Sequence, residues 1–129
     1  DVMAIYNQAL PEVSQMLTAA TRTAQTSGYV TTALGRRARL DHGHAYKALN
    51  RQIQGTAADI MKLKLVELHQ QRKQTGFTLR FTVHDEVDGD CPDQHCAEQV
   101  QQILNTQSLN TTVPLLWDVS TGETWGACD

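Results

Sequence analysis

The alternation of apolar and polar residues over positions 78–91 predicts a β-hairpin with an acidic turn. Leu79, Phe81 and Val83 alternate with polar side chains, which is the period of a half-buried strand. The turn is predicted at 84–86, His-Asp-Glu, and the alternation resumes behind it. A rigid strand end that presents a carboxylate to open space suits Mg²⁺, which takes oxygen ligands. The same pattern also fits an acidic hairpin that is only solvated.

Apolar residues recur at helical spacing in four other stretches. Residues 3–10 predict one helix, and a second begins at Pro11 and ends near Gly28, because proline suits a first helical turn and glycine a helix end. The longest pattern covers 45–73, and its apolar stripe comprises Leu49, Ile53, Ala57, Met61, Leu65 and Leu68. Asp93 is predicted to cap one more helix. The inward face of that helix comprises Cys96, Val100, Ile103 and Leu104.

Three short segments complete the predicted elements. Residues 28–34 and 36–40 are rich in β-formers around Gly35 and predict a second hairpin. Residues 113–119 predict a final strand, and Trp125 is expected to hold the tail behind it. The fold class is therefore α+β, with an antiparallel sheet of two hairpins and a C-terminal strand packed against long helices.

The long predicted helix carries polar residues in line with its apolar stripe. Asn50 and Gln54 fall within the arc that is apolar further along the helix, and Lys47 and Arg51 flank them. Polar side chains in line with a core face need partners, either in the protein or in a ligand. Gly55 costs about 1 kcal/mol relative to alanine in a helix, and it permits either a bend or a close approach of another backbone.

Length and composition indicate one compact, folded domain. The chain has 129 residues, of which 40% are hydrophobic and 19% charged, so it can bury a core. We find no apolar run near the roughly 20 residues of a membrane span and no signal peptide. Three cysteines argue for a reducing compartment. Because the first residue is Asp1 rather than Met, we expect a cut, processed or engineered piece.

The formal net charge of −3 does not indicate a nucleic-acid binder, but the charges are unevenly distributed. Residues 36–51 contain five basic residues and one acid, whereas residues 85–98 contain six acids and no base. A basic face and an acidic site in one small domain suit a polyanion that is handled together with metal ions. Chance clustering on two solvated faces explains the charges equally well.

Other chemistries have weaker support. Cys91, His95 and Cys96, with His84 or Cys128, offer zinc ligands, but their spacing fits no finger pattern and favours buried thiols. A short loop contains further candidate metal ligands, which are more often plain loop residues: Asp41, His42 and His44. No EF-hand, Walker loop, dinucleotide fingerprint or serine-hydrolase elbow is present.

Four ordered sets of segments stand out together: 28–32 with 35–37, 50–59, 83–86, and 113–115 with 122–125. In this order they are similar to the hairpin after the fingers, the long palm helix, the last palm motif on a β-turn-β and the C-terminal end of one family. Together they resemble the family A DNA polymerases of the bacterial polymerase I type, with phage-like features.

This resemblance implies a role for the whole chain. Residues 1–129 would form a single unit of the palm, with an antiparallel palm-type sheet; 1–27 would be a helical lead-in from the fingers side and 28–129 the palm itself. The reaction would be template-directed nucleotidyl transfer with two Mg²⁺ ions in the complete enzyme. The partners would be primer-template DNA, deoxynucleoside triphosphates and the missing N-terminal polymerase portion, in the same or a separate chain. The expected location is the cytoplasm of a bacterium or phage-infected host, without a membrane.

The resemblance also implies residue roles. Asp85 would be a catalytic residue and the Mg²⁺ ligand, Glu86 would support that site, and His84 would contact the primer terminus. Asn50 and Gln54 would lie against the minor groove, whose acceptors are shared by all base pairs, so that amides check shape rather than sequence. The candidates for backbone phosphates are Arg36, Arg37, Lys47 and Arg51.

The sequence differs from that of a complete bacterial member in two respects. The second palm aspartate and the triphosphate-binding residues of the fingers are not in this sequence, so we expect the chain alone to be inactive and its hairpin to expose an unpaired edge. Tyr46 stands where bacterial members often carry arginine, and the short loop over 37–45 is more like phage members. The alternative function is a non-catalytic duplex nucleic-acid-binding module that retains the palm fold.

Overall fold

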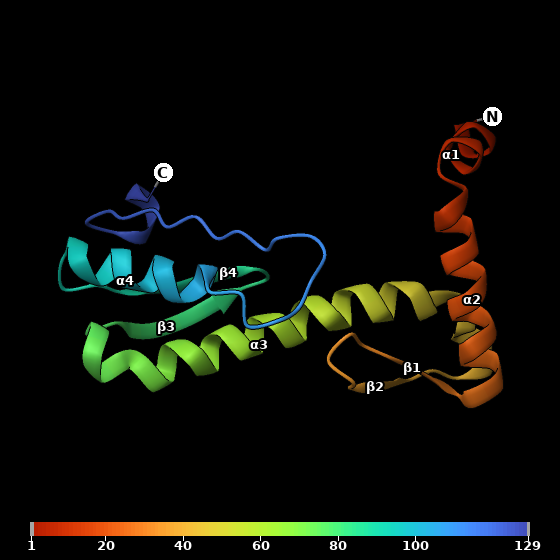
Figure 1. Cartoon of the computed structure of the whole chain (residues 1–129), viewed down its shortest axis with the longest axis horizontal. Helices are drawn as coiled ribbons and strands as arrows, with labels where there is room; N and C mark the ends of the chain where they lie inside the picture. Colours follow the sequence, from red (N-terminus) through yellow and green to blue (C-terminus); the bar gives the residue numbers. More distant parts are fainter. Residues whose placement is uncertain (1, 129) are drawn as a thin grey trace. The chain divides into compact units, whose positions relative to one another are not determined.

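The computed structural model describes residues 2–128, apart from one side chain, that of Met3. The chain divides into two compact units, Asp1–Ile60 and Met61–Asp129, which are described separately below. One long helix, α3 (Ala48–Thr75), contributes residues to both units (Figure 1). That the two units act together as one palm stays a prediction. None of the helices described over 2–128 has the length and apolar character needed to cross a membrane.

The first unit starts with two helices whose ends follow from proline and glycine. As expected, Pro11 occupies the first turn of α2, and Gly28 ends that helix at φ 75° while its N–H donates to the carbonyl of Ala24. The remaining elements of this unit precede α3 and are short. In chain order the elements are α1 (Val2–Ala9), α2 (Pro11–Ser27), β1 (Tyr29–Thr31), β2 (Arg37–Arg39) and the 3₁₀-helix η1 (His42–Lys47).

Small side chains form the core of the first unit. Helix α2 contacts β1 and η1, and the alanines at these contacts let the backbones approach closely. The buried residues are Ala20, Ala24, Val30, Ala45 and Ala48. The predicted hairpin over 28–40 is confirmed, since β1 and β2 pair antiparallel with Val30 opposite Ala38. The segment expected as a loop at 41–44 instead enters η1, so α3 begins at Ala48 rather than at residue 45.

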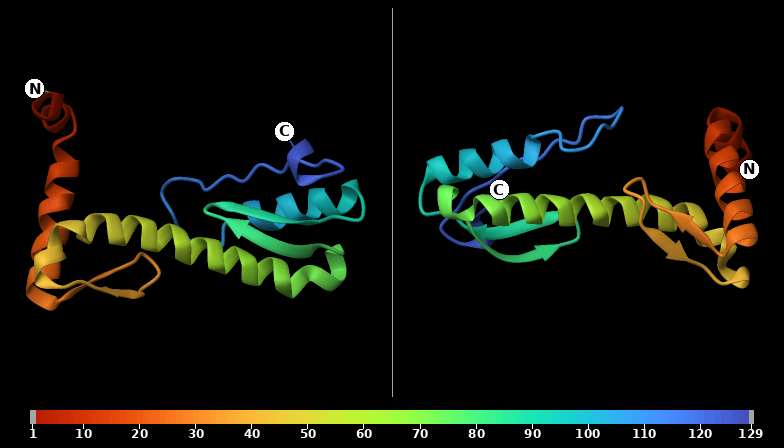
Figure 2. Two further views of the ribbon diagram at one scale, coloured as in Figure 1. Left: turned by 180° about the vertical axis from the view of Figure 1, so that it is seen from behind. Right: turned by 60° about the horizontal axis from the view of Figure 1, so that its bottom comes forward.

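In the second unit, the C-terminal half of α3, the β3–β4 hairpin and α4 lie side by side around one core (Figures 1 and 2). The elements are β3 (Thr78–Val83), β4 (Glu86–Asp90), α4 (Gln94–Asn105) and a 3₁₀ turn η2 (Trp125–Ala127). The predicted cap of α4 is confirmed, because the carboxylate of Asp93 accepts from the N–H of Cys96 at 2.8 Å. The buried core comprises Leu68, Phe77, Cys96, Val100, Ile103 and Leu104.

The sheet differs from the expected one in two respects. The two hairpins do not join; within residues 2–128, β1 pairs with β2 and β3 pairs with β4 in separate two-stranded sheets. The described residues cover the apolar face of β3 only in part, since Leu79, Phe81 and Val83 are 41%, 45% and 39% exposed. On the N-terminal half of α3, Leu49 of the predicted stripe packs against the first core, whereas Ile53 is 57% exposed. The alternating pattern predicted the strand correctly, but part of its apolar face stays exposed in the described residues.

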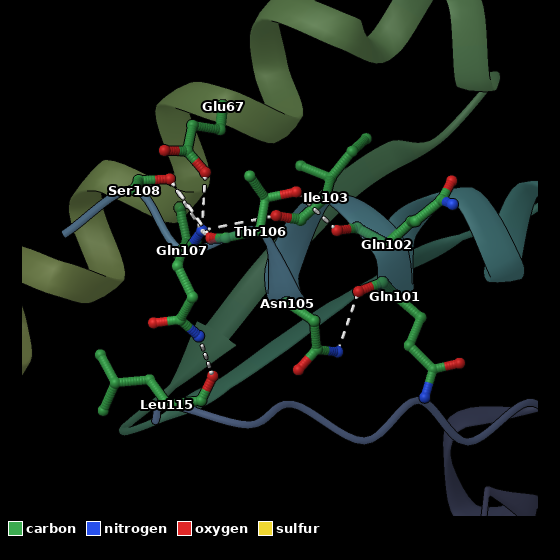
Figure 3. A network of polar contacts seen from close by, with 10 residues as sticks. Glu67, Gln101, Gln102, Ile103, Asn105, Thr106, Gln107, Ser108 and Leu115 are labelled. Atoms are coloured by element: carbon green, nitrogen blue, oxygen red, sulfur yellow. Dashed lines mark hydrogen bonds and ion pairs between the residues drawn. The ribbon is translucent and has the colours of Figure 1, made fainter. Parts of the chain in front are cut away.

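The predicted strand at 113–119 is wrong: this segment is extended but pairs with no strand in the described chain. The side chain of Asn105, at the end of α4, takes the place of a neighbouring strand. Its Nδ2 donates to the carbonyl of Trp117 at 2.7 Å, and its Oδ1 accepts from the N–H of Trp117 at 2.9 Å. Gln107 adds a bond to the carbonyl of Leu115 at 3.3 Å (Figure 3). Backbone groups that a ladder would have satisfied are therefore bonded to side-chain amides.

A buried lysine joins α3 to the end of α4. Lys64 is 4% exposed, and its Nζ donates to the carbonyl of Thr106 at 2.6 Å and to Ser108 Oγ at 3.1 Å. It also pairs with Glu67 at 2.8 Å (Figure 3). The carbonyl of Ile103 lies 3.4 Å from the same nitrogen. A cation at a helix C-terminus satisfies carbonyls that lack intrahelical donors and complements the helix dipole.

Replacing this lysine should destabilise the second unit. Lys64→Ala removes the charged donor from the carbonyl of Thr106 and from Ser108 Oγ, and leaves Glu67 without its cation. We expect a loss of about 2–3 kcal/mol in the free energy of unfolding, because hydrogen bonds from charged groups are the stronger ones. Urea unfolding measures it, with Lys62→Ala as control because Lys62 is exposed on the same helix. Equal stabilities of the two variants would contradict this role.

Candidate nucleic-acid and metal site

The acidic turn is a two-residue connection with a strained backbone. Val83 pairs with Glu86 across the hairpin, which leaves His84 and Asp85 as its two turn residues. His84 has φ 52°, the left-handed region that glycine favours. Such a conformation costs of order 1–3 kcal/mol in a residue with a side chain, and strain of this kind concentrates at functional sites. The exposed Asp85 side chain therefore sits on a two-residue turn whose other residue is in the left-handed region.

A hollow of about 670 Å³ lies behind this turn, bounded by the hairpin and the C-terminal segment. Asp85 and Glu86 line it together with Phe81 and Trp125. The indole N–H of Trp125 donates to Glu86 Oε1 at 3.3 Å, and its ring meets Phe81 edge-on with centroids 5.7 Å apart. The expectation that Trp125 holds the tail is thus confirmed, and its contact is with the carboxylate next to Asp85.

A further carboxylate lies on the same strand. Asp88 is two residues after Glu86, so both side chains project from the same face of β4. Its Oδ2 is buried and has no hydrogen-bond partner among the residues that the structure describes. Burial, and next the negative charge of Glu86, raise the pKa of Asp88 above its usual value. The acidic strand is therefore an electrostatically crowded surface rather than a set of independent solvated charges.

The donor set fits a single point of attachment for Mg²⁺. Within residues 2–128, no group of three or more acidic, histidine or cysteine side chains is arranged to enclose a metal ion. Mg²⁺ is commonly held by one or two carboxylates, with water and substrate phosphates as the other ligands. Asp85, exposed at the tip of the turn, offers one such carboxylate. One exposed carboxylate is therefore compatible with a shared Mg²⁺ ligand and does not by itself enclose an ion.

The polar face of α3 belongs to the first unit. Asn50 and Gln54 are exposed there, as is the neighbouring Arg51. Lys47 Nζ lies 5.5 Å from the ring centroid of Tyr46, so the two side chains form a cation–π contact. Because these residues and Asp85 lie in different units, their convergence on one DNA end stays a prediction.

The two adjacent arginines of the β1–β2 hairpin differ in their partners. Arg36 pairs with Asp59 of α3 at 2.6 Å and donates to the carbonyl of Gly55 at 3.1 Å. Arg37 instead lies over the ring of Tyr29, 4.9 Å from its centroid, and stays exposed. Arg36 is therefore occupied within the protein, whereas Arg37 presents its charge to solvent.

The alternative zinc ligands form a buried thiol pair. Cys91 and Cys96 have their sulfur atoms 3.0 Å apart, and Cys96 is 1% exposed. Burial, followed by the hydrogen bond to Cys96, raises the pKa of Cys91 to about 12. His95 is exposed on α4, and the second group offers only His44 and Asp41 at 4.0 Å. Neither arrangement encloses a metal ion among the described residues.

Sequence reasoning missed three residues that shape these surfaces. Asp59 and Lys64 are charged residues on the long helix that are buried by contacts with other elements. Asp88 is an acid inside a predicted strand. The sequence feature that could have identified them is a charged residue next to apolar neighbours in the same helix or strand. That feature shows that a partner is needed, but it does not say which residue supplies it.

The raised pKa of Asp88 predicts that the stability of the folded chain depends on pH. A pKa raised in the folded state means that ionised Asp88 disfavours folding, so stability is greatest below the unfolded pKa of 3.8 and falls as pH rises through the folded pKa. Asp88→Asn should therefore stabilise the chain at pH 7 and do so less at pH 4. Thermal unfolding at both pH values measures this, with Asp118→Asn as an exposed control. A variant that is less stable at pH 7 would contradict the assignment.

The thiol pair predicts selective alkylation. A pKa near 12 leaves Cys91 protonated at pH 8, and thiolates rather than thiols react. With iodoacetamide at pH 8, mass spectrometry should find the exposed Cys128 modified first and Cys91 and Cys96 only after unfolding. Added Zn²⁺ should not change this order. Protection that appears only with Zn²⁺ would restore the zinc interpretation.

Comparison with known proteins places this geometry in a family. A sequence profile described as DNA polymerase family A matches residues 1–127. The DNA polymerase of Mycobacterium phage D29 is 35% identical over 89 residues, 67% of this chain and 14% of that protein. The thermostable DNA polymerase I of Thermus thermophilus is 32% identical over 133 aligned positions, 93% of this chain and 16% of that protein.

A solved structure agrees with these sequence matches. The POL domain of Pol1 from M. smegmatis, in complex with DNA primer-template and dNTP, superposes with a TM-score of 0.71 at 28% identity. The match covers 80% of this chain and 21% of that one. The chain thus spans less than a quarter of the length of these relatives. The resemblance noted in the sequence and the α+β fold class are both confirmed. The chain belongs to DNA polymerase family A.

Proposed function

We propose that this chain forms the palm portion of a template-directed DNA polymerase and supplies one carboxylate, Asp85, to its magnesium site. The observation that carries the proposal is the exposed Asp85 on a two-residue turn whose first residue, His84, has a left-handed backbone. Family membership supports the reaction class. The M. smegmatis relative, which was solved with primer-template and dNTP, supports DNA and nucleotides as partners.

In this proposal the turn residues have separate tasks. Asp85 holds Mg²⁺ through an oxygen, and Glu86, fixed by its bond from Trp125, adds negative charge beside it without binding the metal directly. His84 contacts the primer terminus. When bound, Mg²⁺ ions neutralise charge on the attacking and leaving oxygens of nucleotidyl transfer. The rigid turn serves this chemistry because it fixes the direction of the carboxylate before substrate arrives.

The first unit contacts the duplex in the same proposal. Asn50 and Gln54 lie against minor-groove acceptors, whose positions are alike in all four base pairs and therefore report shape. Arg37, Lys47 and Arg51 are exposed and contact backbone phosphates. Arg36 is the weakest of the phosphate candidates, because its guanidinium is already paired with Asp59.

Further polymerase parts are needed for activity. One carboxylate does not bind and space two Mg²⁺ ions against a triphosphate, and the described residues offer no enclosing group of ligands. We therefore infer that the chain is inactive alone and acts with an upstream portion, in the same or a separate chain. The open apolar face of β3 and the unpaired strand edges of its hairpin are suitable surfaces for that portion.

Replacing Asp85 in the assembled polymerase tests the proposal. Asp85→Ala should lower the rate of primer extension by roughly 100-fold to 1,000-fold, because a catalytic metal contributes several kcal/mol to the transition state. Binding of primer-template duplex, measured by fluorescence anisotropy, should change little. The control is Glu98→Ala, an exposed acid on α4 that should leave both unchanged.

Two results would contradict the proposal. Retained extension in Asp85→Ala would remove this carboxylate from the metal site. Lack of extension by the unmodified assembly, together with tight duplex binding, would favour a non-catalytic duplex-binding module.

A further inference from the structure

A buried carboxylate on α3 joins this helix to the turn between β1 and β2. Asp59 is 9% exposed, and both of its oxygens bind the turn. Thr32 donates its hydroxyl to Oδ2 at 2.7 Å, and Arg36 donates Nε to Oδ1 at 2.6 Å. The hydroxyl of Thr32 in turn accepts the backbone N–H of Arg36 at 3.1 Å. These three side chains are the Asp59 network, and all of them lie in the first unit.

A glycine lets the turn come this close. Gly55 is one helical turn before Asp59, and its carbonyl accepts from Arg36 Nη2 at 3.1 Å. A Cβ at this position would lie 2.9 Å from Thr32 Cγ2 and 3.2 Å from Arg36 Nη2, so the side chains of Thr32 and Arg36 would have to shift. The helix therefore accepts the cost of about 1 kcal/mol of an internal glycine for a contact with the turn.

Two further bonds define which face of α3 the turn occupies. Gln52 Nε2 donates to the carbonyl of Thr31 at 3.2 Å, and Thr56 Oγ1 accepts the N–H of Ala33 at 3.0 Å. The helix positions that bind the turn are thus spaced i, i+3, i+4 and i+7, which is one face of an α-helix. They are Gln52, Gly55, Thr56 and Asp59.

The opposite face carries the amides. At about 100° per residue, Asn50 and Gln54 lie within about 20° of the direction opposite to Gln52. Both are exposed, and the apolar residues beside them, Ile53 and Ala57, are also exposed. Apolar packing holds the start of α3 through Ala48 and Leu49, and polar contacts with the turn hold the face of residues 52–59. A rotation of roughly 20° at a radius of about 5–6 Å would move an amide by roughly 2 Å, enough to break a hydrogen bond.

We propose that Asp59, bound by Thr32 and Arg36, is a positioning residue that sets the rotation of α3 and so directs Gln54 at the minor groove of the primer-template duplex. This inference rests on the proposed function, in which Gln54 contacts that groove. Asp59 itself is buried against the turn and does not touch DNA. Replacing Asp59 should therefore change how strongly binding and extension depend on minor-groove acceptors, rather than the chemical step itself.

The test removes groove acceptors one at a time in the assembled polymerase. Primers carry 3-deazaadenine, which lacks the N3 acceptor, at each of the last four positions in turn. Dissociation constants and kcat/KM for extension are compared with those for unmodified adenine. For the wild-type protein, affinity and kcat/KM should fall by roughly threefold to tenfold at one position, which is the value of a single hydrogen bond. Gln54→Ala should be insensitive to the modification there.

Two variants of the Asp59 network carry the inference. Asp59→Asn removes the charge at constant size. Thr32→Val replaces the hydroxyl with a methyl group of similar size, and it serves if the first variant does not fold. Both should show a penalty below twofold at the sensitive position. When either substitution is combined with Gln54→Ala, the dissociation constant should be no higher and kcat/KM no lower than in Gln54→Ala alone. The matched control is Asp41→Asn, an exposed acid of the same unit, which should keep the full penalty.

The outcomes separate this inference from the proposed function. A full wild-type penalty in Asp59→Asn and Thr32→Val, with none in Gln54→Ala, would overturn the positioning role and leave the groove contact intact. The absence of a penalty in the wild-type protein at every position would overturn the groove contact itself. A network that only stabilises the fold would lower the melting temperature and leave the penalty unchanged.

Discussion

Two buried charged side chains on one helix are the contacts on which the rest of this structure depends. Within the first unit, Asp59 of α3 binds Thr32 and Arg36 of the β1–β2 turn. Within the second unit, Lys64 of the same helix binds the carbonyls at the end of α4. A buried charge is costly unless it is paired and hydrogen-bonded, so each of these groups admits few alternative arrangements. Both units thus combine modest apolar cores with well-defined polar contacts.

The acidic turn follows a similar logic on the surface. The strained backbone of His84 and the short connection fix the direction of Asp85, while its carboxylate stays open to solvent. The tail supplies a second constraint, since Trp125 packs on Phe81 and donates to Glu86. Of two adjacent carboxylates, Glu86 is therefore hydrogen-bonded within the protein and Asp85 is open to solvent. That difference is the physical basis for giving Asp85 and Glu86 different roles.

Local patterns were reliable where the physical cause is itself local. Pro11, Gly28 and Asp93 each end or begin a helix through their own backbone preference or side chain, and the structure has them in these positions. The hairpin around Asp85 likewise follows from alternation and turn length. The segment 113–119 was misassigned because an extended pattern becomes a strand only when another strand is available to pair with it. Here the amide of Asn105 meets that backbone instead.

The sequence by itself determined the helix ends, both hairpins, the acidic turn at Asp85, the polar face of α3 and, through its ordered motifs, the family. Only the tertiary structure decided that Arg36 binds Asp59, 23 residues away, and that Lys64 binds Thr106, 42 residues away. Periodicity reports which face of an element is apolar, and charge reports that a partner is required. Neither identifies the partner, because that depends on which distant segments are brought within hydrogen-bond distance when the chain folds.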